Sequence, residues 1–450
     1  VMPALPRTAT ANPLRRSLTE EFVQANEAAA ADPDVDHAAA PIPDNVQAFF
    51  RQFFPGRNVG PEDSFETMGG DSLSYIHFSL RFEERFGPLP SGWEALTVAQ
   101  LEQCRTPVRA NGWRRLESAT LTRAFFMICI VALHLDTFVY SKNWGAAYFL
   151  FMLCGYSVMR FQWPEISRTG NVSTIFGTIV RVAIPTFMVV VLIIAMLLAI
   201  AIPTFLVVVA MQLWARTFEP KPPLLISNWF DPEQYHVAYY YFAEIYMQLL
   251  LIVAALLAIP KVRELFRSHP MGSSTALMII AIIISWQVER VWDTNYLYHR
   301  TPIWYLWTVG AGMLIASVRD LRDRVFAMVV VTAAVVEHHG LTSASAYITG
   351  GVALLLFVPE ISVPAWVKTI VAEIAASSMF MYLSHYQVKS LVIRLFHGPM
   401  PWFSLFAAIG FGIVFARIYN WADQGVRTFA RAHWKRDRLP PSGPDRLLVH

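Results

Sequence analysis

The first strongly apolar stretch of the chain, TRAFFMICIVALHLD, contains two titratable side chains, Arg123 and His134. Eleven helical residues at about 100° each turn through about 1100°, about 20° more than three full turns, so both side chains lie on one helix face. They are about 16 Å apart along the helix axis. Titratable groups are costly inside a bilayer and tend to mark a function. An imidazole suits general acid–base chemistry, whereas Arg123 also fits a side chain that reaches the membrane surface from a helix end.

A serine stands in a polar setting upstream, in the stretch FETMGGDSLSYI at residues 65–76. Gly-Asp-Ser-Leu is also the motif of a family of serine esterases, in which the serine is a nucleophile. That chemistry needs an α/β domain with a later Asp-x-x-His, and too few residues separate Ser72 from the apolar region to form one. A local interpretation is that Asp71 or Ser72 caps the helix that follows.

The residues around Ser72 favour a third interpretation. The stretch NVQAFFRQFF at residues 45–54 has the spacing of an amphipathic helix, and a Pro/Gly joint and the short helix WEALTVAQLEQC come later. Between them, the segment that begins at Ser72 has apolar residues at helical spacing, namely Leu73, Ile76, Leu80 and Phe86. This order of helix, long loop, Gly-Gly-Asp-Ser-Leu, helix, joint and helix resembles an acyl or peptidyl carrier protein.

The resemblance implies a covalent cofactor and a modifying enzyme. Ser72 would carry 4′-phosphopantetheine through a phosphodiester, attached by a phosphopantetheinyl transferase. A helix start favours a phosphate through its dipole. Gly69 and Gly70 allow a tight backbone turn, after which Asp71 and Leu73 complete the motif.

The segments on either side of this domain are shorter. Residues 1–18 contain LPRTATANPLRRSL, which resembles the closing motif of adenylation domains, although Ala11 and Asn12 stand where that motif has glycine and the catalytic lysine. The resemblance implies an upstream adenylation enzyme or domain that loads the carrier, and a basic N-terminal tail is the alternative. The predicted boundaries are 19–42 for a linker, 43–106 for the carrier domain and 107–120 for a second linker.

The remaining chain has the composition of a membrane protein. Hydrophobic residues make up 55% of the 450 residues and charged residues 15%, whereas soluble proteins have about 25% charged residues. A helix needs about 20 apolar residues to cross a bilayer, and residues 121–422 contain runs for about ten such spans. The candidate spans are 121–141, 145–160, 178–213, 236–259, 272–291, 303–318, 325–337, 342–358, 370–393 and 402–421, and a basic tail covers 423–450.

Basic residues gather after the second, fourth and sixth spans and in the tail. Loops rich in lysine and arginine favour the cytoplasmic side of the membrane. All these clusters lie on that side only if the segment 178–213 crosses the membrane once. We therefore expect a multi-pass protein of the cytoplasmic (inner) membrane, in contact with membrane lipid, with both termini in the cytoplasm. The net charge of +3 is too small to indicate nucleic-acid binding. The three cysteines give neither a disulfide framework nor a metal-binding spacing.

The order of motifs in the apolar region resembles the membrane-bound acyltransferase-3 family. The Arg-x10-His pair is followed by YFLFMLCGYSVM at residues 148–159, similar to the family's Phe-Phe-x-Leu-Ser-Gly-Phe with Cys154 in place of the serine. Arg181 and Pro185 fit the family's Arg-x-x-x-Pro at the start of the third span. The segments YYYFAEIYMQLLL and MFMYLSHYQV are similar to two later family segments and contain Glu244, Gln248, Tyr382 and His385.

This second resemblance implies an all-α fold, in which a small helical carrier bundle precedes a polytopic membrane domain. It assigns catalysis to His134 and Arg123, and donor binding or support to the five later residues. Four of the five also have structural explanations: Arg181 as an anchor at a helix end, Glu244 and Gln248 in polar pairs inside the bundle, and His385 as a structural hydrogen-bonding group.

The implied reaction transfers an acyl group from a thioester donor to a hydroxyl, or an amine, of a glycan, lipid or secondary-metabolite acceptor. We expect the arm on Ser72 to present the donor, because tethering raises its local concentration to about the mM range. His134 would be the general base, with an acyl-histidine intermediate less favoured. Arg123, helped by Arg181, would neutralise the pantetheine phosphate.

Two other classes of function fit parts of the sequence. A transporter or flippase with a carrier-domain regulator would also place histidine and glutamate inside the membrane, but it would be expected to show paired repeats with broken helices. A membrane-anchored carrier scaffold that serves external synthetase enzymes would not need Arg123 and His134 on one helix face.

Overall fold

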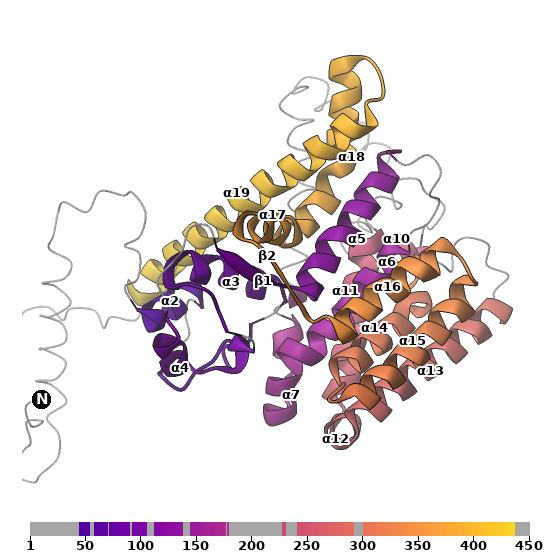
Figure 1. The fold of residues 1–450 in the computed structure, drawn as a ribbon, viewed down its shortest axis with the longest axis horizontal. Coiled ribbons are helices and arrows are strands. Elements are labelled where there is room, and N and C mark those ends of the chain that lie inside the picture. Colours follow the sequence, from indigo (N-terminus) through magenta and orange to yellow (C-terminus); the bar gives the residue numbers. More distant parts are fainter. Residues whose placement is uncertain are drawn as a thin grey trace, which may run out of the picture.

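The computed structural model describes two units that lie side by side (Figure 1). The small N-terminal unit covers residues 45–105, and a larger helical bundle covers residues 113–436. The described residues are 45–54, 58–70, 72–90, 92–105, 112–137, 145–176, 178–179, 227–230, 241–291 and 300–436. The adenylation-like segment, the first linker, almost all of the predicted span 178–213 and the end of the basic tail lie outside these ranges.

The N-terminal unit is built from helices. They are α2 Val46–Phe53, α3 Ser72–Phe86, the 3-10 helix η1 Trp93–Ala95 and α4 Val98–Gln103. Helix α2 begins where the Asn45 side chain accepts a hydrogen bond from the Ala48 N–H, and α4 begins at a capping box of Thr97 and Gln100. Both longer helices, α2 and α3, lie where the apolar spacing predicts a helix.

Aromatic rings fill the centre of this unit. Phe78 of α3 stacks on Trp93 with ring centroids 4.9 Å apart, and Phe49 and Phe50 of α2 meet Phe78 edge-on. Such ring pairs contribute about 0.5–1.5 kcal/mol each beyond the burial of their area. Packing of these rings therefore joins α2, α3 and η1.

The two glycines before α3 have separate reasons to be glycine. Gly69 has a φ of 67°, in the left-handed region that side chains avoid. A Cβ on Gly70 would lie 2.1 Å from the ring of Phe65, far inside contact distance. The chain can therefore turn tightly against the aromatic core immediately before Ser72.

A two-stranded sheet joins the N-terminal unit to the bundle. Strand β1 Trp113–Glu117 pairs antiparallel with β2 Glu360–Pro364, and Leu116 lies opposite Ile361. The Ser118 N–H donates to the Pro359 carbonyl at 2.9 Å, so α5 starts directly from the sheet. Part of the segment predicted as the second linker is thus a paired strand.

The bundle consists of packed helices of unequal length. In chain order they are α5 Ser118–His134, α6 Ala146–Ser157, the π-helical segment η2 Val158–Gln162, α7 Trp163–Thr169, α10 Ser227–Phe230, α11 Tyr241–Ala258, α12 Pro260–Ser268, α13 Pro270–Val291, α14 Pro302–Ala316, α15 Leu321–His339, α16 Ser343–Phe357, α17 Ala365–Ala376, α18 Ser378–Phe396 and α19 Pro401–Arg436. The first predicted span therefore begins three residues earlier than expected and ends at His134.

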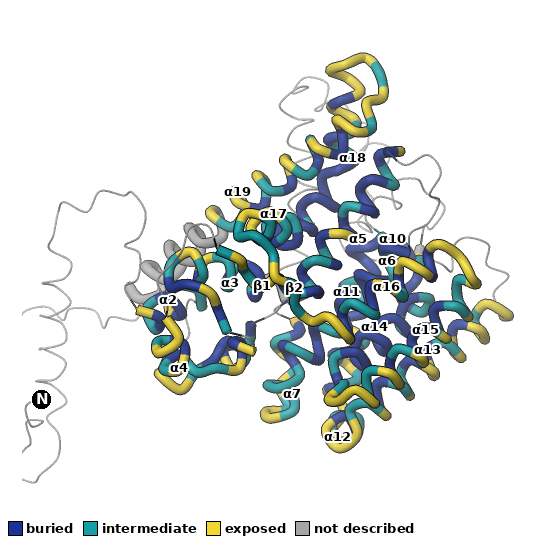
Figure 2. Tube along the Cα trace, viewed as in Figure 1, coloured by how far each residue is buried: buried dark blue, intermediate teal, exposed yellow. Residues whose placement is uncertain are grey.

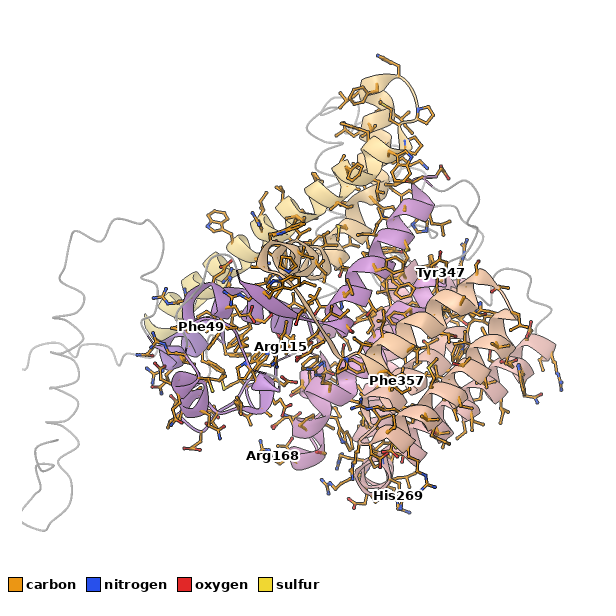
Figure 3. All side chains as sticks on the ribbon, in the orientation of Figure 1. Phe49, Arg115, Arg168, His269, Tyr347 and Phe357 are labelled. Atoms are coloured by element: carbon orange, nitrogen blue, oxygen red, sulfur yellow. The ribbon has the colours of Figure 1, made fainter. Side chains whose placement is uncertain are left out.

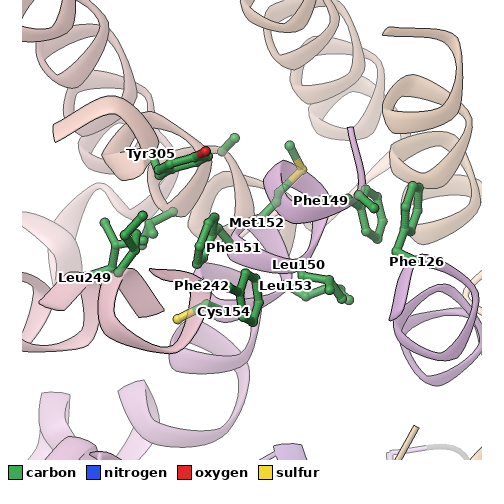
Figure 4. Close-up of a cluster of buried hydrophobic side chains, with 14 of the residues drawn as sticks. Phe126, Phe149, Leu150, Phe151, Met152, Leu153, Cys154, Phe242, Leu249 and Tyr305 are labelled. Carbon is green, nitrogen blue, oxygen red and sulfur yellow. The ribbon is translucent and has the colours of Figure 1, made fainter. Parts of the chain in front are cut away.

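Helices α6 and α14 pack closely at the centre. A Cβ on Gly155 would lie 2.0 Å from the Val309 carbonyl oxygen, and one on Gly312 would lie 1.8 Å from that of Met152. Small residues allow such close approach of helix backbones in membrane proteins. Around this contact, rings from different helices gather in a buried cluster that includes Phe151, Phe242 and Tyr305 (Figure 4).

The outer surface of the bundle is apolar. Among the described residues, the helices long and apolar enough to cross a membrane are α11, α13 and the Pro401–Trp421 part of α19, and α5, α14 and α16 are shorter apolar helices. The exposed faces of α13 and α19 are visible in Figure 2, and α13 exposes four isoleucines, Ile279, Ile280, Ile283 and Ile284. Exposed apolar faces of this kind fit contact with lipid.

One predicted span is divided. The sequence predicts a single span at 370–393, but α17 ends at Ala376 and α18 begins at Ser378. Lys368 of α17 is buried in an ion pair with Glu83 of the N-terminal unit. Helix α17 is therefore held at the junction between the units, while α18 continues into the bundle.

Candidate active site

Two of the predicted site histidines meet inside the bundle. His134 is the last residue of α5, and its Nδ1 lies 2.9 Å from Nε2 of His385, which is 251 residues later in the chain on α18. The two rings are nearly parallel, with centroids 4.9 Å apart. His385 is fully buried and His134 is half-buried. The half-buried ring of His134 is thus held by a hydrogen bond to the buried ring of His385.

A backbone carbonyl fixes where the protons of this pair lie. Nδ1 of His385 is 2.5 Å from the carbonyl oxygen of Tyr382, which can only accept, so this nitrogen carries a proton. In the neutral ring of His385 the other nitrogen, Nε2, must accept, and the proton between the rings therefore belongs to Nδ1 of His134. Nε2 of His134 keeps its lone pair, which is the state that a general base requires.

Lys389 caps the C-terminal end of α5 beside the histidine pair. Nζ of Lys389 donates to the backbone carbonyl of His134 at 3.0 Å and to the Asp136 carboxylate at 2.8 Å. The ring of Tyr386 stacks on His134, with centroids 5.2 Å apart. Sequence reasoning missed these three residues. The available signal was that Lys389 lies four residues after His385, on the same face of a helix.

Tyr382 connects the histidine pair to α11. Its hydroxyl oxygen accepts a hydrogen bond from the backbone N–H of Phe242 at 3.3 Å, one of the N–H groups that a helix start leaves unpaired. Its ring contacts both Phe242 and His385, with centroid distances of 5.1 and 5.5 Å. Tyr382 therefore helps to position His385 through its carbonyl and its ring.

Glu244 and Gln248 belong to a separate polar cluster around Asn228 of α10. The Asn228 N–H donates to Glu244 at 3.2 Å, and the side-chain amides of Asn228 and Gln248 exchange hydrogen bonds of 3.0 and 2.9 Å. Asn228 also donates to the carbonyl of Arg300 at 2.9 Å. These hydrogen bonds join α10 to α11.

Arg123 lies towards the other end of α5, against the N-terminal unit. It lines a small open cavity together with Tyr75 and Ile76 of α3 and Thr120 of α5. Burial, followed by the neighbouring Glu117 carboxylate, raises the pKa of Tyr75 well above its usual range, so that the hydroxyl stays a neutral donor. The cavity thus brings the first turns of α3 next to the cationic side chain of α5.

The remaining predicted residues are placed only in part. Ser72 is the first residue of α3, one turn before Tyr75 and Ile76. Asp71 and Arg181 lie outside the described residues. Cys154, which replaces a family serine, is a free thiol 2% exposed in the apolar core, where it packs. Within the described ranges, no group of three or more His, Cys, Asp or Glu side chains is arranged to hold a metal ion.

Comparison with known proteins identifies the larger part of the chain. A protein-family model described as an acyltransferase domain, that of the acyltransferase-3 family, matches residues 116–421. A search of curated proteins and a search of solved structures gave no match. The matched region starts within β1, contains the histidine pair and ends in α19. Because it covers more than half of the chain, this protein belongs to the acyltransferase-3 family of membrane-embedded acyltransferases.

Proposed function

We propose that the protein is an O-acyltransferase of the cytoplasmic membrane whose N-terminal unit is its own acyl carrier. The acyl group would pass from 4′-phosphopantetheine on Ser72 to a hydroxyl, or an amine, of a glycan, lipid or secondary metabolite. One observation carries this proposal. A single helix, α5, runs from the cavity that Arg123 shares with α3 to the histidine pair at His134.

The residues before and after Ser72 fit the covalent arm. Ser72 starts a helix of 15 residues, and the positive dipole end of such a helix favours a phosphate. Gly69 and Gly70 allow the turn that leads into this helix. When bound, phosphopantetheine supplies a thiol on which an acyl group is held as a thioester.

In the proposed reaction, His134 moves the proton. Its Nε2 takes the proton of the acceptor hydroxyl while the hydroxyl oxygen bonds to the acyl carbon, and it returns the proton to the leaving group when the acyl bond to that group breaks. His385 accepts the hydrogen bond from Nδ1 throughout and keeps the ring in the required tautomer. General-base catalysis of this kind contributes about 10²–10⁴-fold.

Arg123 is proposed to bind the donor. A guanidinium in the cavity beside α3 can pair with the phosphate next to Ser72, since arginine forms strong charge-assisted contacts with phosphate oxygens. The resemblance to the acyltransferase-3 family adds Arg181 to this task, although Arg181 lies outside the described residues. The two ends of α5 would then divide donor binding from proton transfer.

The distribution of basic residues supports a cytoplasmic position for the N-terminal unit and for both termini. Arg168 of α7 and His269 beside α12 are labelled at one end of the bundle, and Tyr347 at the opposite end (Figure 3). The guanidinium of Arg267 on α12 donates to the carbonyl of Ser167 on α7. The basic helix α12 therefore meets α7 at the end that the rule for positive charges assigns to the cytoplasm.

Mass spectrometry of the intact chain tests the proposal. The protein is produced together with a phosphopantetheinyl transferase, in membranes with and without acceptor extract. Wild-type protein is expected to carry the arm on Ser72 and to lose its acyl group when acceptor is added, whereas Ser72→Ala carries neither. His134→Ala is expected to keep the arm and the acyl group. A His134→Ala protein that still discharges its acyl group would refute the assignment of the base.

A further inference from the structure

The N-terminal unit and the bundle contact each other through α3 and α17. Three alanines of α17, Ala372, Ala375 and Ala376, pack into the same apolar cluster as the aromatic core of the N-terminal unit. Phe161 of η2 joins this cluster and contacts the ring of Tyr75, with centroids 5.1 Å apart. Small side chains on α17 thus allow α3 to approach closely.

The first charged contact in this interface is a buried ion pair. Nζ of Lys368 on α17 lies 2.7 Å from both carboxylate oxygens of Glu83 on α3. The two side chains are only 11% and 12% exposed. Removal of one member of such a pair leaves the other charge buried without compensation, which strongly disfavours the contact.

The second charged contact is a network centred on Arg160 of η2. The guanidinium donates to Glu94 of the N-terminal unit at 2.6 Å and to Glu117 of β1 at 2.8 Å. The Tyr75 hydroxyl donates to the same Glu117 carboxylate at 2.5 Å and accepts from the Trp93 indole at 3.0 Å. A π-helical segment positions Arg160, and such segments occur frequently at functional sites.

The two ion pairs that cross between the units have the same polarity. The N-terminal unit supplies the carboxylates, Glu83 and Glu94, and the bundle supplies the cations, Lys368 and Arg160, while β1 adds the Glu117 carboxylate from the bundle side. Contacts of complementary charge give orientation and specificity, and polar interfaces between domains are typical of contacts that form and separate. This pattern differs from the ring packing inside the N-terminal unit.

We propose that this face of the bundle is a reversible docking site for the N-terminal unit, with Lys368 and Arg160 as its recognition residues. The inference rests on the proposed function, because docking places α3 at the Arg123 cavity, where the donor would enter. Tyr75 and Ile76 lie on the docked side of α3, because both line cavities together with Thr120 of α5. An enzyme that modifies Ser72 by contact with this side of α3 therefore needs the separated state.

The connection between the units has the length for such a separation. Nine residues, 104–112, lie between the end of α4 and the start of β1. Fully extended, they span at most about 30 Å, at about 3.3–3.6 Å for each residue. Because β1 is paired with β2, the connecting segment is anchored to the bundle at β1. It therefore keeps the separated N-terminal unit close to its docking site.

Hydrogen–deuterium exchange on the full chain tests docking without reference to activity. Lys368→Glu, which places two carboxylates together, is expected to increase exchange in α3 and α17 and to speed phosphopantetheinylation of Ser72 about tenfold. The double variant Glu83→Lys with Lys368→Glu should restore both. Arg168→Glu is the matched control, since Arg168 forms an exposed pair with Glu165 away from the interface. If Lys368→Glu does not fold, the milder Glu83→Gln is expected to change both readouts in the same direction.

The outcomes separate docking from the proposed function. Unchanged exchange in both Lys368→Glu and Glu83→Gln, or a double variant that behaves like the single one, overturns the docking site. Increased exchange at α3 and α17 with reversal in the double variant supports it, even if Ser72 accepts no arm, and in that case the proposed carrier function falls alone.

Discussion

The histidine pair and the junction between the two units both bury polar side chains, but they do so in different ways. In the bundle, His134 and His385 are neutral rings joined by a hydrogen bond whose direction is set by the Tyr382 carbonyl. At the junction, Lys368 and Glu83 are opposite charges held at 2.7 Å. The first arrangement preserves a lone pair, and the second neutralises charge.

This difference matches two tasks. A proton acceptor must remain able to gain a charge, which a neutral relay allows and a salt bridge would prevent. A contact between two parts of a chain benefits from charge pairing, because a wrong partner or orientation leaves a charge buried. The two geometries therefore fit the two roles proposed for them, proton transfer at the histidine pair and recognition at the junction.

The largest effect is expected when the accessible ring of the histidine pair is removed. His134→Ala should lower the rate of acyl discharge by about 10³-fold, within the range for loss of a general base. Loading of Ser72 should not change, because the junction is untouched. Discharge is measured by intact-mass spectrometry after addition of acceptor. His269→Ala, at the end of α12, is the control and should keep the wild-type rate.

A smaller effect is expected when the buried ring is replaced. His385→Phe removes the acceptor for Nδ1 of His134 and should lower kcat by about 10²-fold with KM unchanged, because the tautomer is no longer fixed. His385→Gln offers an amide oxygen as acceptor and should recover part of the loss. Steady-state kinetics across pH measure kcat and KM for both variants. Equal losses of kcat in His385→Phe and His385→Gln would show that His385 acts only by packing.

The sequence predicts most helices of this fold because they are long apolar runs. Helices α13 and α14, at Pro270–Val291 and Pro302–Ala316, lie within two residues of the predicted spans 272–291 and 303–318. The division at Ser377 was not predictable from local residues, because no proline or glycine marks it. Helix α17, before the division, makes a tertiary contact that local sequence does not reveal: the buried partner of Lys368 is Glu83, 285 residues earlier.

The candidate site shows the same limit. Arg123 and His134 were predictable as a pair because both lie on one helix, where spacing determines the face. The contact of His134 with His385 was not, since 251 residues separate them and the meeting depends on how α5 packs on α18. The family resemblance predicted Glu244 and Gln248 as site residues. Only the structure shows that Asn228 donates a hydrogen bond to each of them.

Glycine substitutions compare the packing of the two units. Gly155→Ala places a Cβ 2.0 Å from a backbone oxygen of α14, whereas Gly70→Ala places one 2.1 Å from a side-chain atom, in the ring of Phe65. We expect Gly155→Ala to destabilise the protein by about 3 kcal/mol and Gly70→Ala by about 1 kcal/mol. Thermal unfolding in detergent measures both. Gly410→Ala, with open space around its Cβ, serves as the control.

Equal losses at Gly155 and Gly70 would show that the aromatic core of the N-terminal unit is as rigid as the backbone contact in the bundle. In that case the turn before Ser72 would be set by packing against Phe65, and not only by the left-handed conformation of Gly69.

The smallest effect is expected from Glu66, next to the charged network of the junction. Burial, followed by the nearby Glu94 carboxylate, raises the pKa of Glu66 above its ordinary value of 4.5, although Arg160 opposes the shift. A carboxyl group whose pKa is raised by folding binds its proton more tightly in the folded state. Its contribution to stability is therefore greatest below pH 4.5 and is lost as the pH rises through the folded pKa.

Glu66→Gln should accordingly raise the Tm at pH 7, by only about 1 °C because the side chain is half-exposed and solvent screens it. At pH 4 the gain should disappear, since the wild-type carboxyl group is then protonated as well. Glu62→Gln, in the same loop and exposed, should change neither value. A lower Tm at pH 7 would mean that attraction to Arg160 outweighs repulsion by Glu94, and that Glu66 belongs with the paired charges that hold the junction.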